Sequence, residues 1–371
     1  TFEVAVTDLN GTAPVVWATS HAWPSYVNPS WDPRGETLTV SYFGSMAVTF
    51  SSPGIKVGDW QPGGLGHFVL MDVTDAAPSV DLEAVPVSSA PDTTARVSIT
   101  DADDMISAIT SRCRFDVGAW IPCPAQWSVR AGEGQHTFTV EAADPAGRTT
   151  LVTRTWLVDH TAPVARLTKL PAAQVGTSSE VSWSATDVAG IDGFQVRTRS
   201  ASRSDVLGSW VTPKAWTKAT SRRETGKPGS EYCYSVRARD RAGNIGPWSS
   251  QSCVALVLDD TAFRAGEGWN TSFANNYAYR SRSRSGSDGA RVTLSKVSSA
   301  RIGLLVETCP TCGSIEVWLG GKRLGKLSTR SSKTKYQQML WLPSGKTRSG
   351  KLVLEVVGNR RVYIDGIAVR H

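Results

Sequence analysis

The sequence predicts an all-β chain built from several small domains, and three observations lead to that fold class. Val, Thr, Ser and Trp are prominent, with 14 Trp against 4 Met in 371 residues. Stretches rich in Ala, Leu, Glu and Lys that would form long helices are missing. The 33 Gly and 19 Pro recur between short apolar runs, about every ten residues. This composition is typical of many short strands joined by turns.

Length and apolar content set the scale of these domains. At about 100–200 residues per domain, the chain holds two to four of them. An apolar fraction of 40% excludes wholesale disorder. A membrane-spanning helix needs about 18 consecutive apolar residues, and the sequence contains no such run. The chain begins at Thr1 without an apolar leader, so we expect a processed protein or, better, a piece of a longer polypeptide.

The first 63 residues predict strands at 3–8, 14–18, 36–43 and 45–50, with a type I turn at Asp32–Gly35. The string Pro29-Ser-Trp-Asp-Pro-Arg-Gly35 resembles the Pro-x-Trp-Ser-Pro-Asp-Gly signature of TolB-like, WD40-like β-propeller blades, and Asp59–Pro62 resembles the usual end of such propellers. The resemblance implies an incomplete terminal blade at 1–63 with its neighbours upstream, because a blade buries its faces against other blades. The tryptophans of this segment would then be core residues: Trp17, Trp23 and Trp31.

An internal repeat defines the middle of the chain. Phe138–Arg148 and Tyr234–Asn244 share the pattern aromatic-x-Val-x-Ala-x-Asp-x-Ala-Gly-x at an offset of 96 residues. The pattern predicts a strand that enters a turn, where the Asp side chain accepts backbone N–H bonds and the Gly takes a positive φ. The offset is the size of one immunoglobulin-type sandwich. Markers at Asp75–Pro78 and Asp159–Pro163 then delimit two domains, 76–160 and 161–258.

The six cysteines form three local pairs: Cys113 with Cys123, Cys233 with Cys253, and Cys309 with Cys312. Each of the first two pairs is symmetric about a Gly-containing turn, which in an antiparallel hairpin brings the Cβ atoms to bridging distance. The third pair lies between two strand-like runs, which favours a tight disulfide over a redox dithiol at a helix N-terminus. Zinc is set aside because the cysteines are paired and the five His are scattered. Three disulfides indicate an oxidising compartment and therefore an extracellular location.

Two family resemblances cover residues 76–258. Cys113–Cys123 followed by Gly134–Gly147 resembles bacterial Ig-like domains of secreted proteins. The second domain resembles fibronectin type III (FnIII) through Val181–Trp183, Tyr232–Ala238 and Ala242–Ser249. The resemblances imply two β-sandwiches that serve as spacers or generic binding surfaces, and they say little about function.

The last third of the chain, 261–371, is basic and predicts a further sandwich. Residues 259–371 hold 19 Lys/Arg and 8 Asp/Glu, a balance of +11, whereas residues 1–258 hold 21 and 25. Strands are expected at 290–294, 301–307, 314–319, 322–327, 336–342, 351–357 and 361–369, a jelly-roll number. Trp269, Tyr277, the hairpin Val317–Lys322 and the closing Val362–Val369 resemble galactose-binding-like jelly rolls related to carbohydrate-binding modules. The acidic calcium cluster common in such modules is not evident, because Glu267 stands alone.

This module supplies the predicted binding site. Sugars bind to aromatic faces and polar groups, and alternating arginines in a strand share one face that suits anionic glycans. The predicted glycan- or anion-binding residues are Trp269, Tyr277, Tyr279, Arg280, Arg282, Arg284 and Tyr336. The alternative is that most of these rings are core, as we expect for Trp318 and Trp341. Nucleic acid is not expected beside a disulfide-forming chain.

Catalysis and metal binding are not expected. The sequence has no HExxH, GxSxG or P-loop motif, and its His residues fall in separate modules. Two acidic groups, Asp101/Asp103/Asp104 and Asp187/Asp192, invite a calcium interpretation, but calcium needs about 6–8 converging oxygen ligands, and turn capping is favoured. No cofactor is predicted.

The predicted function is a non-catalytic extracellular or cell-surface protein whose basic module binds a polysaccharide or anionic cell-wall polymer, with the middle domains as monomeric spacers. One alternative is a structural or adhesive stalk with protein partners. The other is the accessory tail of an enzyme whose catalytic part lies upstream. Exposed clustered aromatics would favour glycan binding, and their complete burial would favour the stalk.

Overall fold

The computed structural model describes residues 76–371, apart from 84, 86, 89–91, 102–108, 125 and 146, together with the backbone of five short strands before residue 52. These strands are β1 (Val6–Asp8), β2 (Pro14–Val16), β3 (Val27–Asp32), β4 (Thr37–Tyr42) and β5 (Met46–Ser51). β1 pairs with β2, and β3-β4-β5 form an antiparallel sheet. Residues 33–36, Trp17 and Trp23 lie outside the described residues, as does the side chain of Trp31, so the propeller blade stays a prediction.

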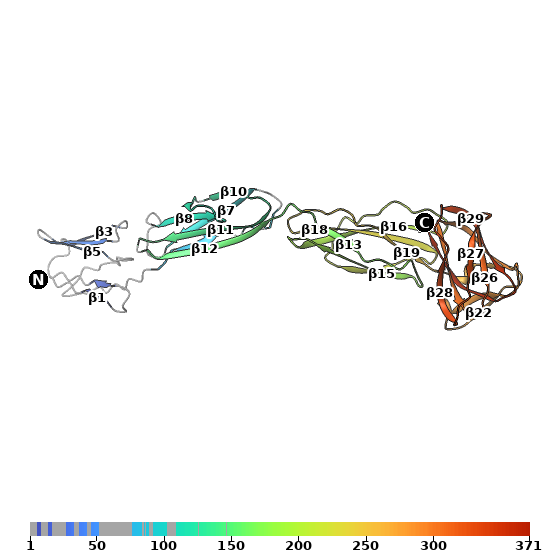
Figure 1. Ribbon diagram of the computed structural model, residues 1–371. Helices are drawn as coiled ribbons and strands as arrows, with labels where there is room; N and C mark the ends of the chain where they lie inside the picture. The colour runs from blue at the N-terminus through green and yellow to red at the C-terminus, as the bar shows by residue number, and fades with distance from the viewer. Residues whose placement is uncertain are drawn as a thin grey trace. The chain divides into compact units, whose positions relative to one another are not determined.

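The described chain is all-β, as predicted, and it divides into two compact units, Thr1–His160 and Thr161–His371 (Figure 1). Strands and short 3-10 turns make up its regular structure. Over the residues described, no helix is long and apolar enough to cross a membrane.

In the first unit, residues 76–160 form a two-sheet sandwich around an aromatic core. One sheet has the order β10 (Gln126–Arg130), β7 (Asp92–Thr100), β6 (Ser79–Leu82); the other has β12 (Thr149–Val158), β11 (Gly134–Ala143), β8 (Thr110–Phe115), β9 (Ile121–Pro122). Trp127 stacks on Phe138 with ring centroids 4.0 Å apart, and Trp156 packs against them. The architecture is the expected sandwich, and the Ig-like assignment stays a prediction.

The first part of the second unit is another sandwich. Its sheets have the orders β13 (Val164–Leu167), β15 (Ser178–Thr186), β17 (Ser221–Thr225) and β14 (Ala173–Gln174), β19 (Ser252–Leu256), β18 (Ser230–Asp240), β16 (Ile191–Ser202). The long β16–β18 pair presents Phe194 and Val196 to a core that also holds Trp183 and Val236. Because side chains alternate along a strand, the odd-numbered residues of β16 face away from that core.

The C-terminal sandwich closes the chain with two larger sheets. One has the order β22 (Asn270–Phe273), β23 (Ser281–Ser285), β30 (Val362–Arg370), β25 (Arg301–Thr308), β28 (Lys335–Trp341), with β20 (Leu258–Asp259) also paired to β30. The other has β21 (Arg264–Ala265), β24 (Arg291–Ser299), β29 (Arg348–Val357), β26 (Ser314–Leu319), β27 (Lys322–Ser328). Two 3-10 turns lie at Asp260–Ala262 and Ala278–Arg280. The seven strands expected between 290 and 369 are confirmed to within a few residues at each end.

The predicted Asp-x-Ala-Gly turns are confirmed in both repeats. Asp144 Oδ1 accepts a hydrogen bond from the Arg148 N–H at 2.8 Å, and Gly147 has a φ of 86°. Asp240 and Asn244 repeat that bond at 2.8 Å, and the equivalent glycine has a φ of 97°. Residues with a side chain rarely adopt such angles, so the turn requires its glycine.

The three predicted disulfides are present: Cys113–Cys123, Cys233–Cys253 and Cys309–Cys312. In the second pair the cysteines lie directly opposite each other in the β18–β19 ladder. In the first pair, Cys113 lies opposite Ile121, and Cys123 follows β9. The third pair closes a turn in which the Cys312 N–H donates to the Cys309 carbonyl at 3.2 Å.

The two sandwiches of the second unit share a packed joint. Its apolar residues are Ala255, Val257, Ala278, Leu305 and Ala368, with Met339 and Trp341 against them. Glu231, 1% exposed, accepts hydrogen bonds from the Arg370 guanidinium and the His371 backbone N–H, both at 2.8 Å. Since Leu258 pairs with Ile367, the segment expected to link the domains is itself a strand of the C-terminal sheet. These contacts hold residues 161–371 together as one unit.

Candidate ligand-binding site

Two of the predicted aromatic residues in the C-terminal sandwich are buried. Trp269, 7% exposed, belongs to the main core, and Tyr277 is 4% exposed. A sugar ring stacks on an open aromatic face, and burial leaves these two rings without one. Trp269 therefore agrees with the alternative stated for the sequence, that rings in this set are core, whereas Tyr277 is buried outside the main core.

Tyr277 and Arg282 belong to a closed polar cluster on the outer face of the β23-β30-β25 sheet. The Arg282 guanidinium lies between the rings of Tyr277 and Tyr363, 4.5 Å and 4.4 Å from their centroids. Arg282 Nη1 pairs with Glu307 Oε2 at 2.7 Å, and the Tyr277 hydroxyl donates to the same oxygen. Burial raises the pKa of Glu307, and the Arg282 charge offsets part of that rise. The charged and hydrogen-bonding groups of this cluster are therefore paired with one another and not with a ligand.

Tyr279 and Arg280 lie outside the strand that was expected to align the three arginines. Both have positive φ, 53° and 67°, in the turn before β23, so Arg280 does not continue the alternation of Arg282 and Arg284. The Tyr279 hydroxyl donates to the Val257 carbonyl and accepts from the Gly176 N–H, each at 3.0 Å. Tyr279 thus fastens the joint of the second unit.

Tyr336 and Arg284 are the predicted residues best placed to meet a ligand. Tyr336 is 40% exposed and meets the Tyr277 ring edge-on, with centroids 5.5 Å apart. Arg284 is half-buried on β23, opposite Tyr363. These two side chains flank the closed cluster, and with exposed Arg280 they form the remaining part of the predicted surface.

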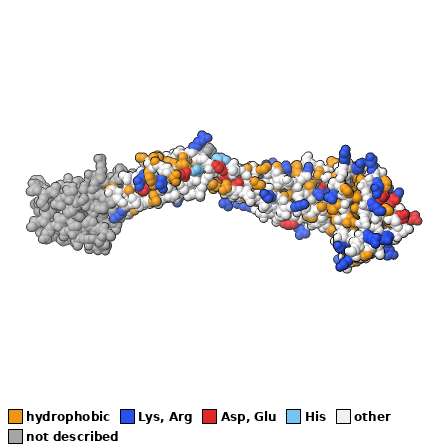
Figure 2. Space-filling model, viewed as in Figure 1, with side chains coloured by type: hydrophobic (Ala, Val, Ile, Leu, Met, Phe, Trp, Pro, Cys, Tyr) orange, Lys and Arg blue, Asp and Glu red, His pale blue; other side chains and the backbone are white. Residues whose placement is uncertain are grey.

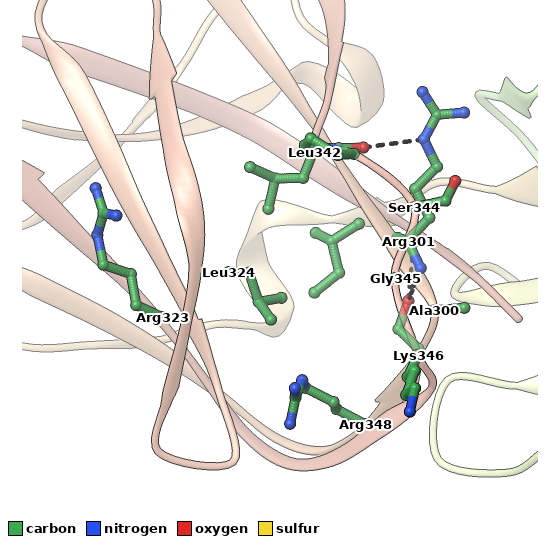
Figure 3. A pocket seen from close by; sticks show the side chains of 12 residues that line it. Ala300, Arg301, Arg323, Leu324, Leu342, Ser344, Gly345, Lys346 and Arg348 are labelled. Carbon is green, nitrogen blue, oxygen red and sulfur yellow. Dashed lines mark hydrogen bonds between the residues drawn. The ribbon is translucent and has the colours of Figure 1, made fainter.

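A hollow of about 250 Å³ lies at one end of the same sandwich, away from the predicted set in sequence. Its floor is apolar, formed by Ile302, Leu324 and Leu342, and Figure 3 shows Leu324 and Leu342 facing its centre. Four cationic side chains line its sides: Arg301, Arg323, Lys346 and Arg348. Pockets for drug-sized ligands measure about 300–1,000 Å³, so this hollow suits one sugar unit rather than a whole oligosaccharide.

The β24–β25 turn, the β28–β29 loop and strand β27 line the hollow, and hydrogen bonds hold the turn and the loop together. The Gly345 N–H donates to the Ala300 carbonyl at 2.8 Å, joining the β28–β29 loop to the β24–β25 turn. Arg301 Nε donates to the Leu342 carbonyl at 3.0 Å, and its guanidinium lies 4.9 Å from the Trp341 ring. Arg323 is paired with Glu316 at 2.8 Å. Two of the four cations are therefore already engaged.

Lys346 and Arg348 are the available charges of the hollow. Both are exposed, and no ion pair with a described residue is found for either. Neither residue is among the predicted binding residues, because neither belongs to the run of alternating arginines at 280–284. The signal was the run Ser344-Gly-Lys-Thr-Arg348, a turn that places two cations two residues apart.

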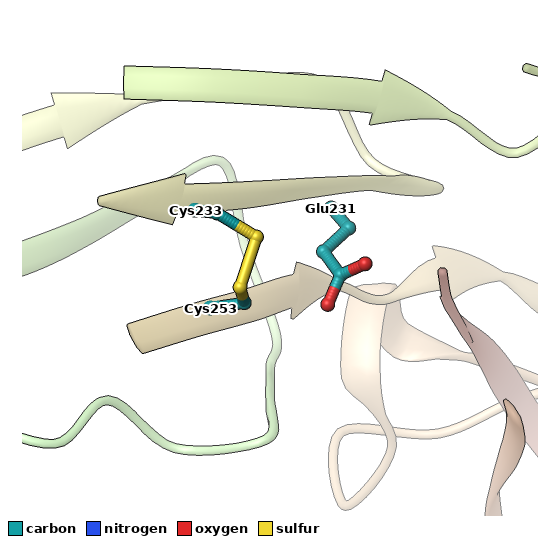
Figure 4. Close-up of side chains that lie close together, drawn as sticks. All are labelled: Glu231, Cys233 and Cys253. Atoms are coloured by element: carbon teal, nitrogen blue, oxygen red, sulfur yellow. A yellow bond between two sulfur atoms is a disulfide. The ribbon is translucent and has the colours of Figure 1, made fainter. Parts of the chain in front are cut away.

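One group of side chains that lie close enough together to hold a metal ion includes two disulfide-bonded cysteines. Glu231, Cys233 and Cys253 lie together in Figure 4, but the two sulfurs are bonded to each other. Burial raises the pKa of Glu231, and its bonds to His371 and Arg370 outweigh that effect and leave the pKa lowered. Of the acidic groups in the sequence, Asp187 caps a turn by accepting from the Ala189 N–H at 2.8 Å, and Asp192 is paired with Arg239. Asp103 and Asp104 lie outside the described residues.

Comparisons with known proteins give partial matches. No protein-family model matches the chain. A 135-residue stretch, 34% of the chain, is 29% identical to chitinase A1 of Niallia circulans and spans 18% of that enzyme. The chain thus covers less than a fifth of the relative it matches.

Solved structures with weak likeness include fibronectin(III)-like modules of Clostridium thermocellum CbhA (13% identity, TM-score 0.25, 48% of this chain and 94% of that one). Another is the Bacteroides ovatus SGBP-B of a mixed-linkage glucan utilization locus, in complex with a heptasaccharide (9%, 0.20, 80% and 100%). A third is a set of β-sandwich carbohydrate-binding modules (11%, 0.21, 79% and 97%). At TM-scores this low, the two-sheet architecture rests on the strand pairing of the chain itself.

Proposed function

We propose that the chain is a non-catalytic extracellular binding protein whose C-terminal sandwich takes an acidic glycan or anionic cell-wall polymer. The observation that carries the proposal is the hollow with an apolar floor and two unpaired cations, Lys346 and Arg348. An apolar floor accepts the C–H face of a sugar ring, and cations at the rim bind carboxylate or phosphate by charge-assisted hydrogen bonds.

The charge of the module supports the same ligand class. The balance of +11 over residues 259–371 attracts anions to this sandwich before any specific contact forms. On the face seen in Figure 2, Lys and Arg side chains are spread over this end of the chain. The partial similarity to a chitinase also agrees with a part in polysaccharide recognition.

The predicted surface around Tyr336, Arg284 and Arg280 is the second candidate for the same function. Its partly exposed tyrosine ring suits a neutral sugar better than the hollow does, because ring stacking does not depend on charge. Domains 76–160 and 161–258 are proposed as spacers of this protein. The alternative is that the chain is the accessory tail of an enzyme.

Retention of the full chain on immobilised polygalacturonate and chitin, at low and high salt, tests the proposal. We expect retention on polygalacturonate that weakens with salt, because Lys346 and Arg348 are exposed charges. The variant Lys346→Gln/Arg348→Gln should bind at least about fivefold more weakly. Arg264→Gln/Arg360→Gln is the matched control: it removes the same charge from exposed residues outside the hollow and should bind like the parent.

Three other results would redirect the proposal. Equal losses in both double variants would show that net charge alone causes retention. Salt-resistant retention on chitin that is lost in Tyr336→Ala would assign the function to the predicted tyrosine surface. Retention on neither polymer would reject glycan binding and favour the structural stalk.

A further inference from the structure

A column of alternating arginine and tryptophan side chains covers the outer face of the β16–β18 pair. Its members, in spatial order, are Arg239, Trp216, Arg237, Trp248, Arg197, Trp210 and Arg199; we call them the Arg–Trp strip. Each neighbouring pair in this order is in contact, with guanidinium carbon to ring centroid distances of 4.8, 5.7, 4.7, 4.4, 4.4 and 4.6 Å.

The strand register sets the spacing of the four arginines. Gly193 lies opposite Arg239, Gln195 opposite Arg237, and Arg197 and Arg199 occupy the next two positions on the same face. Positions on one face of a strand repeat every two residues, about 6.8 Å. The four arginines therefore occupy successive positions over about 20 Å along the strand direction, two on β18 and two on β16.

Connecting segments on both sides of the strand pair deliver the indoles. The segment carrying Trp210 and Trp216 bonds to β16 at Thr198 and Phe194, with backbone N···O distances of 2.7–2.9 Å. On the other side, the Ser249 N–H next to Trp248 donates to the Val236 carbonyl at 2.8 Å. The rings are thus held over the face by backbone hydrogen bonds and not by side-chain packing alone.

The row keeps most of its positive charge. Asp192, which accepts from Arg239 Nε at 2.9 Å, is the one carboxylate that the described residues place against these four side chains. Arg237 and Arg199 bond to neutral amide oxygens, those of Gln195 and Gln251. Burial, and then the charges of Arg199 and Arg237, lower the pKa of Arg197, as expected where cations are not neutralised.

The stacking also decides which ligands fit. Each indole lies between two guanidiniums, whose central carbons are 4.4–5.7 Å from the centroid of its ring. The ring faces are therefore not free to stack on neutral sugars or on nucleic-acid bases. What the strip offers is the N–H edges of planar cations in a fixed row. Such edges match carboxylate or sulfate groups bidentately.

We propose that the Arg–Trp strip is a binding site for an extended acidic polysaccharide, separate from the hollow of the C-terminal sandwich. Residues 161–258 would then be a ligand-binding module and not only a spacer. A row of charges at regular spacing suits a linear polymer whose acidic groups repeat, and the three disulfides agree with an extracellular ligand.

Titration of the full chain with heparin, a sulfated polysaccharide, tests the strip, with dextran as neutral control and polyphosphate as a non-sugar polyanion. Arg199→Gln changes the end member, which stacks on one indole of the strip, Trp210, and should weaken heparin binding about threefold. Arg197→Gln/Arg199→Gln should weaken it at least about tenfold and reduce its salt dependence. Arg222→Gln/Arg223→Gln, on β17 of the opposite sheet, removes the same charge and should change affinity less than twofold.

The parent chain should not bind dextran. Protection of β16 and β18 amides from hydrogen exchange shows whether each variant keeps the sandwich. Unchanged heparin affinity in a folded Arg197→Gln/Arg199→Gln variant would overturn the proposal. So would an equal loss in Arg222→Gln/Arg223→Gln, or tighter binding of polyphosphate than of heparin. The Lys346→Gln/Arg348→Gln variant separates the two sites. If it loses heparin affinity and Arg197→Gln/Arg199→Gln does not, the strip is rejected and the proposed function stands. If only Arg197→Gln/Arg199→Gln loses heparin affinity, the hollow is rejected.

Discussion

Two regions of the second unit hold arginine between aromatic rings, and they differ in how the charge is balanced. In the C-terminal sandwich, Arg282 lies between two tyrosines and is paired with Glu307, with side chains 19% and 9% exposed. On the β16–β18 face, four arginines alternate with three indoles, and the described residues place one carboxylate against them, that of Asp192, which pairs with Arg239. The stacking of arginine on aromatic rings therefore does not by itself identify a binding site. The position of the carboxylates separates a structural cluster from an available row of charge.

The largest expected effect concerns two buried carboxyl groups of the C-terminal sandwich, Asp260 and Asp365. Burial raises the pKa of Asp365 to about 7, and the nearby charges of Asp260 and Asp259 add to that rise. Burial likewise raises the pKa of Asp260 to about 6. Above pH 4 the unfolded chain ionises both groups, whereas the folded chain keeps each protonated up to its raised pKa, about 6 for Asp260 and about 7 for Asp365. The free energy of unfolding therefore falls as pH rises from about 4 to 7.

The variant Asp365→Asn removes the contribution of Asp365 to the pH dependence of the free energy of unfolding. It should flatten the decline between pH 4 and 7 and stabilise the protein at pH 8 by up to about 4 kcal/mol relative to the parent, given about 1.4 kcal/mol per pKa unit. Urea denaturation at pH 4, 6 and 8 measures it. A parent chain whose C-terminal sandwich gains stability over that interval, with Asp365→Asn unchanged, would contradict the expected protonation.

Breaking the ion pair between Arg282 and Glu307 should have the next largest effect on stability. Glu307→Gln leaves Arg282 with little solvent and no carboxylate, and we expect a loss of about 3 kcal/mol in the free energy of unfolding. Hydrogen exchange of the β25 and β30 amides locates the loss. If Glu307→Gln is as stable as the parent, the cluster is not the closed structural element described above.

The stacking in the strip should matter less for stability. Trp248→Ala removes the ring between Arg197 and Arg237, and we expect a loss of about 1–2 kcal/mol, since each exposed cation–π contact contributes about 0.5–1 kcal/mol. Trp248→Phe keeps a ring at that place and serves as the control. Equal losses in the two variants would show that indole size, rather than ring–guanidinium contact, holds the column.

The smallest stability effect is expected at the end of the strip. Asp192 and Arg239 are each 36% exposed, so Asp192→Asn should change the free energy of unfolding by less than about 1 kcal/mol. The same change makes the row more positive and should tighten heparin binding about twofold. Weaker binding in Asp192→Asn would mean that the carboxylate positions Arg239 for the ligand.

Much of the fold followed from local patterns. The repeated Asp-x-Ala-Gly turns were predictable because a carboxylate and a glycine four residues or fewer apart determine the turn by themselves. The disulfides were predictable because each pair is close in sequence. Arg282 and Arg284 alternate in β23, as predicted. Arg280 does not join them, because it lies with Tyr279 in a turn of positive φ and the strand begins at Ser281.

The binding surfaces could not be predicted in the same way. Trp210, Trp216 and Trp248 stand in connecting segments without strand periodicity, and only backbone pairing to β16 and β18 brings them over the arginines. Lys346 and Arg348 gain a shared floor from Ile302 and Leu324, which are distant in sequence. Trp269 lies just before β22 and Tyr277 just before the turn at Ala278–Arg280, so no strand alternation predicts their burial, and packing against other segments decides it.

The sequence alone determined the all-β class, the turns, the disulfides and the basic last third, because each depends on composition or on residues close along the chain. The tertiary structure decided which charges are neutralised and which aromatic faces stay open. Those properties depend on contacts between residues far apart in the sequence, such as Glu231 with Arg370, which are 139 residues apart. Desolvation and pairing act through space, and no local pattern records them.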